Sequence, residues 1–182
     1  MAPDETVELS APDPAWSQHF DQESIKLVHA LVVRSSRVEH IGSTAVPALL
    51  ANPIVDIMVG VDSYPPPPEF LAPLAQMGYE PLGEAGVPAR LCFCKRGSQA
   101  FNLHVVQFGN EHWRNNLLLR DYLRAHALEV ARYGQLKHRI IATGATRSAD
   151  YAAKRNGAIA ALMKRARTWH DAVRPGARKT GS

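Results

Sequence analysis

The sequence has few cysteines and no long hydrophobic run. Cys92 and Cys94 are too few for a disulfide framework, and no second pair completes a zinc-binding set. On a strand the two would point to the same face, where small buried side chains are expected. No apolar stretch approaches the ~20 residues that span a bilayer, and the acidic, polar N-terminus does not resemble a secretion signal. We therefore expect a cytoplasmic protein with no membrane partner.

Charge is distributed unevenly along the chain. Residues 1–110 hold 12 acidic and 6 basic side chains, whereas residues 111–182 hold 5 acidic and 15 basic ones. A basic half attracts phosphates, nucleotides or nucleic acid, although a solvated helical surface gives the same pattern. Aromatic residues make up only 7% of the chain, and no RNA-binding motif is present. A small-molecule or nucleotide ligand is therefore expected, and nucleic acid is not.

The apolar pattern changes at Gly109, from alternating strand-like segments to helical spacing. A length of 182 residues suits one domain with a hydrophobic core, which we place at residues 1–172, followed by a flexible basic tail at 173–182. Helical turns are also expected at 45–51. We predict an α+β (α/β-type) fold with strands at 37–41, 53–61, 91–95 and 101–108, and helices at 14–33, 69–77, 110–126, 129–142 and 148–172.

A glycine-serine turn follows the first predicted strand. Gly42 lets the backbone approach a ligand closely, and Ser43 and Thr44 offer hydroxyl and N–H groups to a phosphate. Alone, such a triplet is more often an ordinary turn or cap. The turn becomes informative only together with polar residues elsewhere in the sheet.

Asp56 lies inside an otherwise apolar predicted strand, where a carboxylate without a partner is costly. It could be structural, paired with an arginine or capping a turn, but we favour a functional role. Asn102 and His104 share one face of a later strand because side chains alternate. A histidine in that position is commonly a hydrogen-bonded core residue. The presence of Asp56 makes His104 a candidate for the same site.

These segments resemble the hallmark of the GrpB family (UPF0157). The resemblance rests on EHIGSTAVP at 39–47 and PIVDI at 53–57, and continues in NLHVV at 102–106 and LRDYLR at 119–124. It covers about residues 7–170. The sequence departs from the family pattern at Ala48 (usually Gly), Asn52 (usually Lys) and Asn102 (often His). The resemblance implies a nucleotidyltransferase-like fold, with a small mixed sheet flanked by helices and a C-terminal helical portion.

Nucleotidyltransferases hold two divalent metals with two acids one residue apart and a third acid on a later strand. By this resemblance Asp56 matches the first acid, Met58 occupies the second position, and His104 lies on a strand that could supply the third. The full acid set is therefore absent. An Asp–His pair suits a softer metal, or none, better than magnesium. The resemblance to metal-dependent enzymes still makes a divalent metal, magnesium or manganese, held by Asp56 and His104 the candidate cofactor.

The resemblance implies a nucleotide- or phosphate-handling protein, with a nucleotidyltransferase-type transferase acting on a small molecule as the preferred function. Asp56 and His104 are the candidate catalytic residues. The alternatives are a catalytically silent ligand-binding module, which Met58 favours, and an enzyme of another reaction class. Some family members are fused to dephospho-CoA kinases, but this chain has no kinase phosphate-binding loop. Candidate phosphate or substrate ligands are Gly42, Ser43, Thr44, His40, Arg90, Asn102, Arg120, Arg124 and Lys137.

Overall fold

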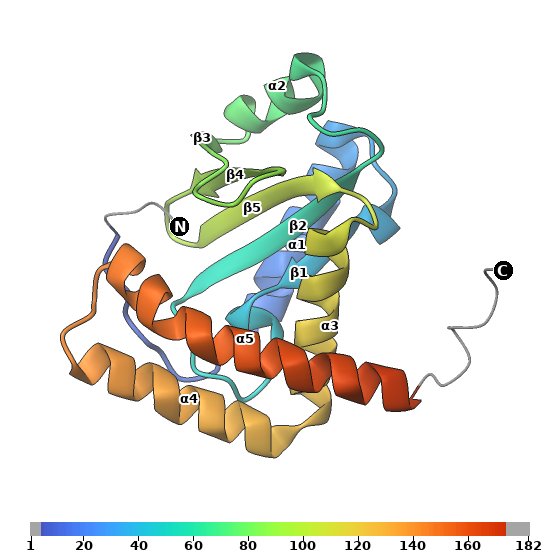
Figure 1. The fold of residues 1–182 in the computed structure, drawn as a ribbon. Helices are drawn as coiled ribbons and strands as arrows, with labels where there is room; N and C mark the ends of the chain where they lie inside the picture. Colours follow the sequence, from blue (N-terminus) through green and yellow to red (C-terminus); the bar gives the residue numbers. More distant parts are fainter. Residues whose placement is uncertain (1–4, 174–182) are drawn as a thin grey trace, which may run out of the picture.

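The computed structural model describes residues 5–173, which contain a five-stranded mixed sheet and five α-helices (Figure 1). The strand order is β1-β2-β5-β4-β3. β2 and β5 are parallel, and the other neighbours are antiparallel. The predicted α+β class is confirmed. The strands are β1 (Val38–Ile41), β2 (Ile54–Val61), β3 (Glu80–Gly83), β4 (Arg90–Lys95) and β5 (Ala100–Gln107).

The helices lie on both faces of the sheet. In Figure 1, α1 lies behind the strands, whereas α3, α4 and α5 gather on the other side. None of the helices within residues 5–173 is long and apolar enough to cross a membrane. The predicted tail lies outside the described residues, apart from Val173 at the end of α5. The helices are α1 (Ala15–Leu31), α2 (Pro68–Gln76), α3 (Glu111–Ala125), α4 (Ala127–Ala142) and α5 (Ser148–Val173).

Strand alternation gives the two faces of the sheet different contents. The face toward α1 and α2 carries Ile57, Val59 and Leu103, all with no exposed surface, and forms the largest hydrophobic cluster. The other face carries Met58 and Val106, which pack on Trp113 and Leu117 of α3. Because β2 is central, both of its faces are covered, and its sequence is accordingly apolar on both.

A row of polar side chains on the α3 face interrupts this apolar pattern. The strand register places Asp56 beside Asn102 and Cys92 beside His104. All four side chains therefore project from the same face. The polar row crosses β2, β5 and β4.

The turn after β1 also differs from a regular helix start. Gly42 has φ 72° and ψ −164°, a conformation essentially restricted to glycine. A single 3-10 turn, η2 (Ser43–Ala45), follows it. The helical turns predicted over 45–51 are therefore wrong, since Pro47 lacks an N–H donor and Ala48 adopts φ 64°.

Candidate functional site

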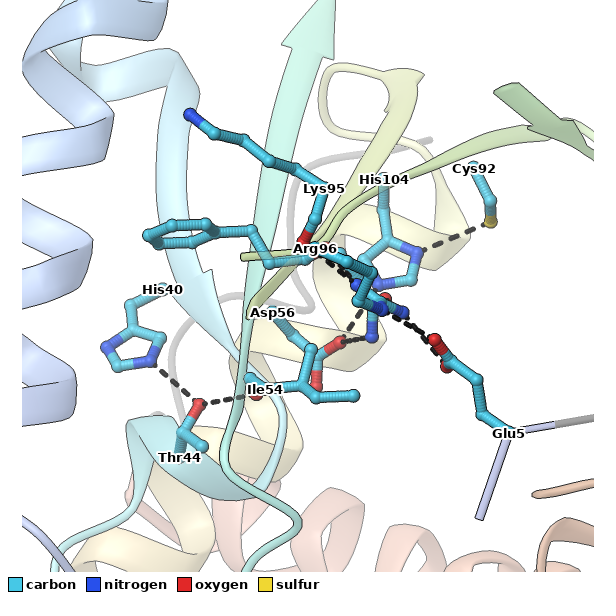
Figure 2. Close-up of polar contacts among 11 residues, drawn as sticks. Glu5, His40, Thr44, Ile54, Asp56, Cys92, Lys95, Arg96 and His104 are labelled. Carbon is cyan, nitrogen blue, oxygen red and sulfur yellow. Dashed lines mark hydrogen bonds and ion pairs between the residues drawn. The ribbon is translucent and has the colours of Figure 1, made fainter. Parts of the chain in front are cut away.

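Asp56 is the centre of the polar row. Its Oδ1 accepts a hydrogen bond of 2.9 Å from Asn102 Nδ2 and lies 3.4 Å from His104 Nε2 (Figure 2). The Asp56 side chain is 28% exposed, whereas that of His104 is 12% exposed. Among the described residues, Oδ2 of Asp56 has no hydrogen-bond partner. One carboxylate oxygen thus remains available to a ligand.

The charges of Asp56 and His104 depend on each other. Burial raises the pKa of Asp56, but the hydrogen bond and charge of His104, and the bond from Asn102, outweigh it and lower that pKa to about 2. Burial lowers the pKa of His104, but its contacts with Asp56 and Cys92 outweigh this and raise it above the ordinary value. Asp56 is therefore a permanent anion near neutral pH. It suits binding a cation or orienting His104 better than accepting a proton.

Three residues in or beside the polar row, Cys92, Arg96 and Glu5, were not among the predicted site residues. Cys92 Sγ lies 3.5 Å from His104 Nδ1, so the imidazole is held from both sides. Arg96 donates to Asn102 Oδ1 at 2.9 Å and forms a two-point ion pair with Glu5 (Figure 2). The antiparallel hairpin of β4 and β5 could have indicated Cys92 beside His104. No local signal connects Glu5 with Arg96, 91 residues away.

The glycine-serine turn borders the same carboxylate. A Cβ added to Gly42 would collide with the side chain of Asp56, so only glycine allows this approach. The next residue, Ser43, is half-buried, and its Oγ lies 2.6 Å from Nζ of Lys137 on α4. The Lys137 side chain is 2% exposed and also donates to the carbonyl oxygen of Leu50 at 2.7 Å. Gly42, Ser43, Asp56 and Lys137 thus meet at one place.

The structure places Thr44 and His40 away from Asp56. His40 pairs in register with Ile57, so its ring lies on the α1 face and stacks on Phe20 with ring centroids 4.8 Å apart. Thr44 is buried, and its hydroxyl lies 3.0 Å from His40 Nε2 (Figure 2). Both side chains therefore belong to the packing beneath the turn. This placement of the two side chains does not support their predicted role as phosphate ligands.

The three predicted arginines occupy different environments. Arg120 is ion-paired with Glu39 at 2.7 Å and with Asp121 at 2.8 Å, which leaves little of its charge for a ligand. Arg124 donates from Nε to the carbonyl oxygen of Ala45 at 2.8 Å and has no ion pair among the described residues. Arg90 begins β4, and its buried Nε has no hydrogen-bond partner in the described part of the chain. Arg124 and Arg90 therefore keep more free charge than Arg120.

The donors near Asp56 do not form a complete metal cage. Met58, at the position of the second acid, has no exposed surface and packs against Ile41, Val106 and Trp113. Within residues 5–173, no group of three His, Cys, Asp or Glu side chains is placed to hold a metal ion. Magnesium typically binds through one or two carboxylates together with phosphate oxygens of the substrate. Asp56 alone fits a metal only in that shared arrangement.

A surface hollow lies away from this site. Its volume is about 480 Å³, and it is bordered by residues 31–34, Arg37, residues 60–63 and Phe70. None of the predicted site residues lines it. Charge there is limited to Arg34 and an ion pair of 2.9 Å between Arg37 and Asp62. We assign the candidate site to the Asp56 region, because functional groups converge there.

A mixed α+β fold with a glycine-serine turn against a strand aspartate is the architecture expected of nucleotidyltransferase-like proteins. The sequence matches the family described as GrpB protein over residues 6–165. The chain therefore belongs to the GrpB family. The crystal structure of the conserved protein GrpB from Enterococcus faecalis has the same fold, with a TM-score of 0.79 and 28% sequence identity. The structural match covers 90% of this chain and 99% of the Enterococcus faecalis chain.

Relatives of similar sequence occur in several bacteria. UPF0157 protein YqkA of Bacillus subtilis is 33% identical over 78% of this chain and 42% of its own length. A UPF0157 protein of Deinococcus radiodurans is 31% identical over 89% of this chain and 84% of its own length. A dephospho-CoA kinase of Mycolicibacterium paratuberculosis is 35% identical over 42% of this chain, but the match covers only 19% of that kinase.

Proposed function

We propose that this protein binds a phosphate-bearing small molecule, such as a nucleotide, between the Gly42–Ser43 turn and Asp56, and acts as a nucleotidyltransferase-type transferase. The observation that carries the proposal is the meeting of Gly42, Ser43, Asp56 and Lys137 at one place. Gly42 lets the turn lie against the Asp56 carboxylate, and the Ser43 hydroxyl and the Lys137 amine are polar partners for phosphate oxygens.

The charges around the turn favour an anion on one side and a cation on the other. Arg124 is exposed beside Ala45 and supplies a positive charge at the edge of the turn. Asp56 would repel a bare phosphate, so it faces the part of the ligand that carries a proton donor or a metal. In that arrangement magnesium or manganese enters together with the phosphate oxygens. His104, held between Asp56 and Cys92, is the candidate proton-transfer group.

Met58 supports a second candidate function, a binding module without catalysis. A fully buried methionine at the position of the second acid removes one of the ligands that a two-metal reaction uses. The same turn and Asp56 would then hold the ligand without transferring a group. Met58→Asp tests this alternative. A gain in magnesium affinity would favour a metal site that has lost one ligand.

Thermal-shift measurements with nucleotides, CoA and phosphorylated metabolites, with and without magnesium or manganese, test the binding step. A ligand at 100 times its dissociation constant stabilises the fold by about 2.7 kcal/mol. Arg124→Met should weaken binding by about tenfold or more, because a charge-assisted hydrogen bond contributes about 1.5–3 kcal/mol. Arg114→Met is the matched control, since Arg114 also lies on α3 and donates to a carbonyl oxygen, that of Gly109. Absence of stabilisation by every anion tested would exclude the proposal.

A further inference from the structure

Lys137 is a buried amine whose side-chain partner is a hydroxyl. Its Nζ lies 2.6 Å from Ser43 Oγ, and no carboxylate among the described residues forms an ion pair with it. A buried ammonium without a counter-ion is costly, so this environment favours the neutral amine. A neutral amine at hydrogen-bond distance from a serine hydroxyl can accept its proton. Serine–lysine pairs with this geometry act as nucleophile and base in several unrelated enzymes.

We propose that Ser43 is a nucleophile and that Lys137 is the base that activates it. The inference rests on the proposed function for its electrophile, the phosphorus of a phosphate ester or anhydride bound at the turn. Ser43 Oγ forms a bond to phosphorus, and its proton passes to Lys137 Nζ. The bond from phosphorus to the leaving oxygen breaks, and that oxygen takes the proton from Lys137. The oxygen of water or of an acceptor hydroxyl then bonds to phosphorus while Lys137 Nζ takes its proton. The bond from phosphorus to Ser43 Oγ breaks, and Oγ takes that proton from Lys137, which regenerates both residues.

The surroundings of Lys137 fit this role. The carbonyl oxygen of Leu50 accepts a hydrogen bond from Nζ and fixes its position, and the ring of Tyr133 lies 4.9 Å from it. Burial, followed by the charge of Arg155, lowers the pKa of Lys137 to about 7, while Asp56 acts in the opposite direction. A base with a pKa near the working pH is deprotonated often enough to accept a proton.

A structural role for Lys137 makes a different prediction. In that case the hydrogen bonds of Nζ only hold α4 against the loop between Ser43 and Leu50, and the Ser43 hydroxyl has ordinary reactivity. Ser43 is half-buried and follows the exposed Gly42, so a reagent can reach it. Chemical reactivity at Ser43 therefore separates the two roles.

The test is labelling of the full chain with a fluorophosphonate, in which a Ser43 oxygen–phosphorus bond replaces the phosphorus–fluorine bond and fluoride leaves. Mass spectrometry should find one label, on Ser43, and the labelling rate should rise with pH through a midpoint of about 7. Lys137→Met and Lys137→Arg should each slow labelling by about 100-fold or more, since neither side chain can accept the proton. Lys164→Met, at an exposed lysine of α5, is the matched control and should label at the wild-type rate.

The wild-type pH profile and Ser43→Ala decide the question even where Lys137 variants unfold. Absence of label on Ser43, or a rate independent of pH between 6 and 8, would overturn the proposal. An unchanged labelling rate in a folded Lys137→Met variant would also overturn it. Stabilisation by phosphate-bearing ligands without labelling would contradict the role of Ser43 as a nucleophile but would still support the proposed function. Labelling of Ser43 without stabilisation by any phosphate compound would contradict the proposed function. It would also contradict the assignment of a phosphate ester or anhydride as the electrophile that Ser43 attacks.

Discussion

The two faces of the sheet each hold a carboxylate, and the difference between them separates a structural acid from a candidate functional one. Glu23 of α1 is 2% exposed, and Lys95 donates to its Oε1 at 2.7 Å and Tyr79 at 3.1 Å. Its Oε2 accepts from Lys26 at 3.2 Å. Asp56 is 28% exposed, and in the described part of the chain only its Oδ1 has hydrogen-bond partners. A carboxylate whose oxygens are both satisfied stabilises the fold, whereas one with a free oxygen can bind a ligand.

The two histidines that lie on strands, His40 of β1 and His104 of β5, show the same difference. His40 stacks on Phe20 on the α1 face, and its burial, with the charges of Arg124 and Arg120, lowers its pKa to about 4 against the opposing effect of Asp56. His104, on the opposite face, has a raised pKa because Asp56 and Cys92 hold its ring. His40 is therefore a neutral core residue at neutral pH. His104 keeps its proton to a higher pH than an ordinary histidine does.

Removing the structural carboxylate should have the largest effect on stability. Glu23→Ala leaves Lys95 and the hydroxyl of Tyr79 without their partner, and should lower the free energy of unfolding by about 3–5 kcal/mol. Ligand binding by the folded fraction should not change. Lys26→Ala removes only an exposed partner and should cost less than about 1 kcal/mol. Urea unfolding measures both, and equal losses in the two variants would contradict the assignment of Glu23.

Gly42→Ala should strain the turn and disturb the carboxylate next to it. The backbone conformation at Gly42 costs other residues about 1–3 kcal/mol. The added methyl group also collides with Asp56 and should displace it. We expect a loss of about 3 kcal/mol in urea unfolding, together with loss of anion binding. Gly144→Ala is a control with positive φ but no atom within 4 Å of the added Cβ, and it should keep anion binding.

The neutral core histidine should make stability depend on pH. The pKa of His40 is about 4 in the folded protein and 6.5 in the unfolded chain. Between these values only the unfolded chain binds the proton, so stability is lost as pH falls from 6.5 to 4, by about 3 kcal/mol in total. His40→Gln should show a shallower decline over this range when unfolding is measured at each pH. Parallel curves for the two proteins would mean that His40 is protonated in the folded state.

Much of the fold could be predicted from the sequence because apolar periodicity is strong in most elements. β2, the β4–β5 hairpin and the C-terminal helices all follow that signal. β3 was not predicted, because it has four residues, includes Pro81, and is irregular between Pro81 and Gly83. An edge strand of this kind carries little hydrophobic pattern.

The meeting of Asp56 with His104 could be anticipated, because each is a polar exception in an apolar strand. The position of His40 could also have been found, since Ile41 faces Asp56 across β1 and β2 and the preceding residue must point to the opposite face. The contact of Lys137 with Ser43 depends on how α4 docks on the turn, 94 residues away in sequence. The ion pair of Glu5 with Arg96, the arginine that donates to Asn102, is equally long-range. Such contacts require the tertiary structure.

Changing the candidate functional carboxylate should have the smallest effect on stability and the largest on the site. Asp56→Asn keeps an oxygen that can accept from Asn102, so the free energy of unfolding at pH 7 should fall by about 1–2 kcal/mol, less than for Glu23→Ala.

Because Asp56→Asn removes the anion, the pKa of His104 should fall, which an NMR titration of its ring would show directly. Any turnover that is found should fall by about 100-fold or more. Asp62→Asn is the matched control, since Asp62 is 92% exposed and, within residues 5–173, forms an ion pair with Arg37 alone. A loss of stability as large as that of Glu23→Ala, with the titration of His104 unchanged, would make Asp56 a structural residue like Glu23. The two faces of the sheet would then no longer differ in the role of their carboxylates.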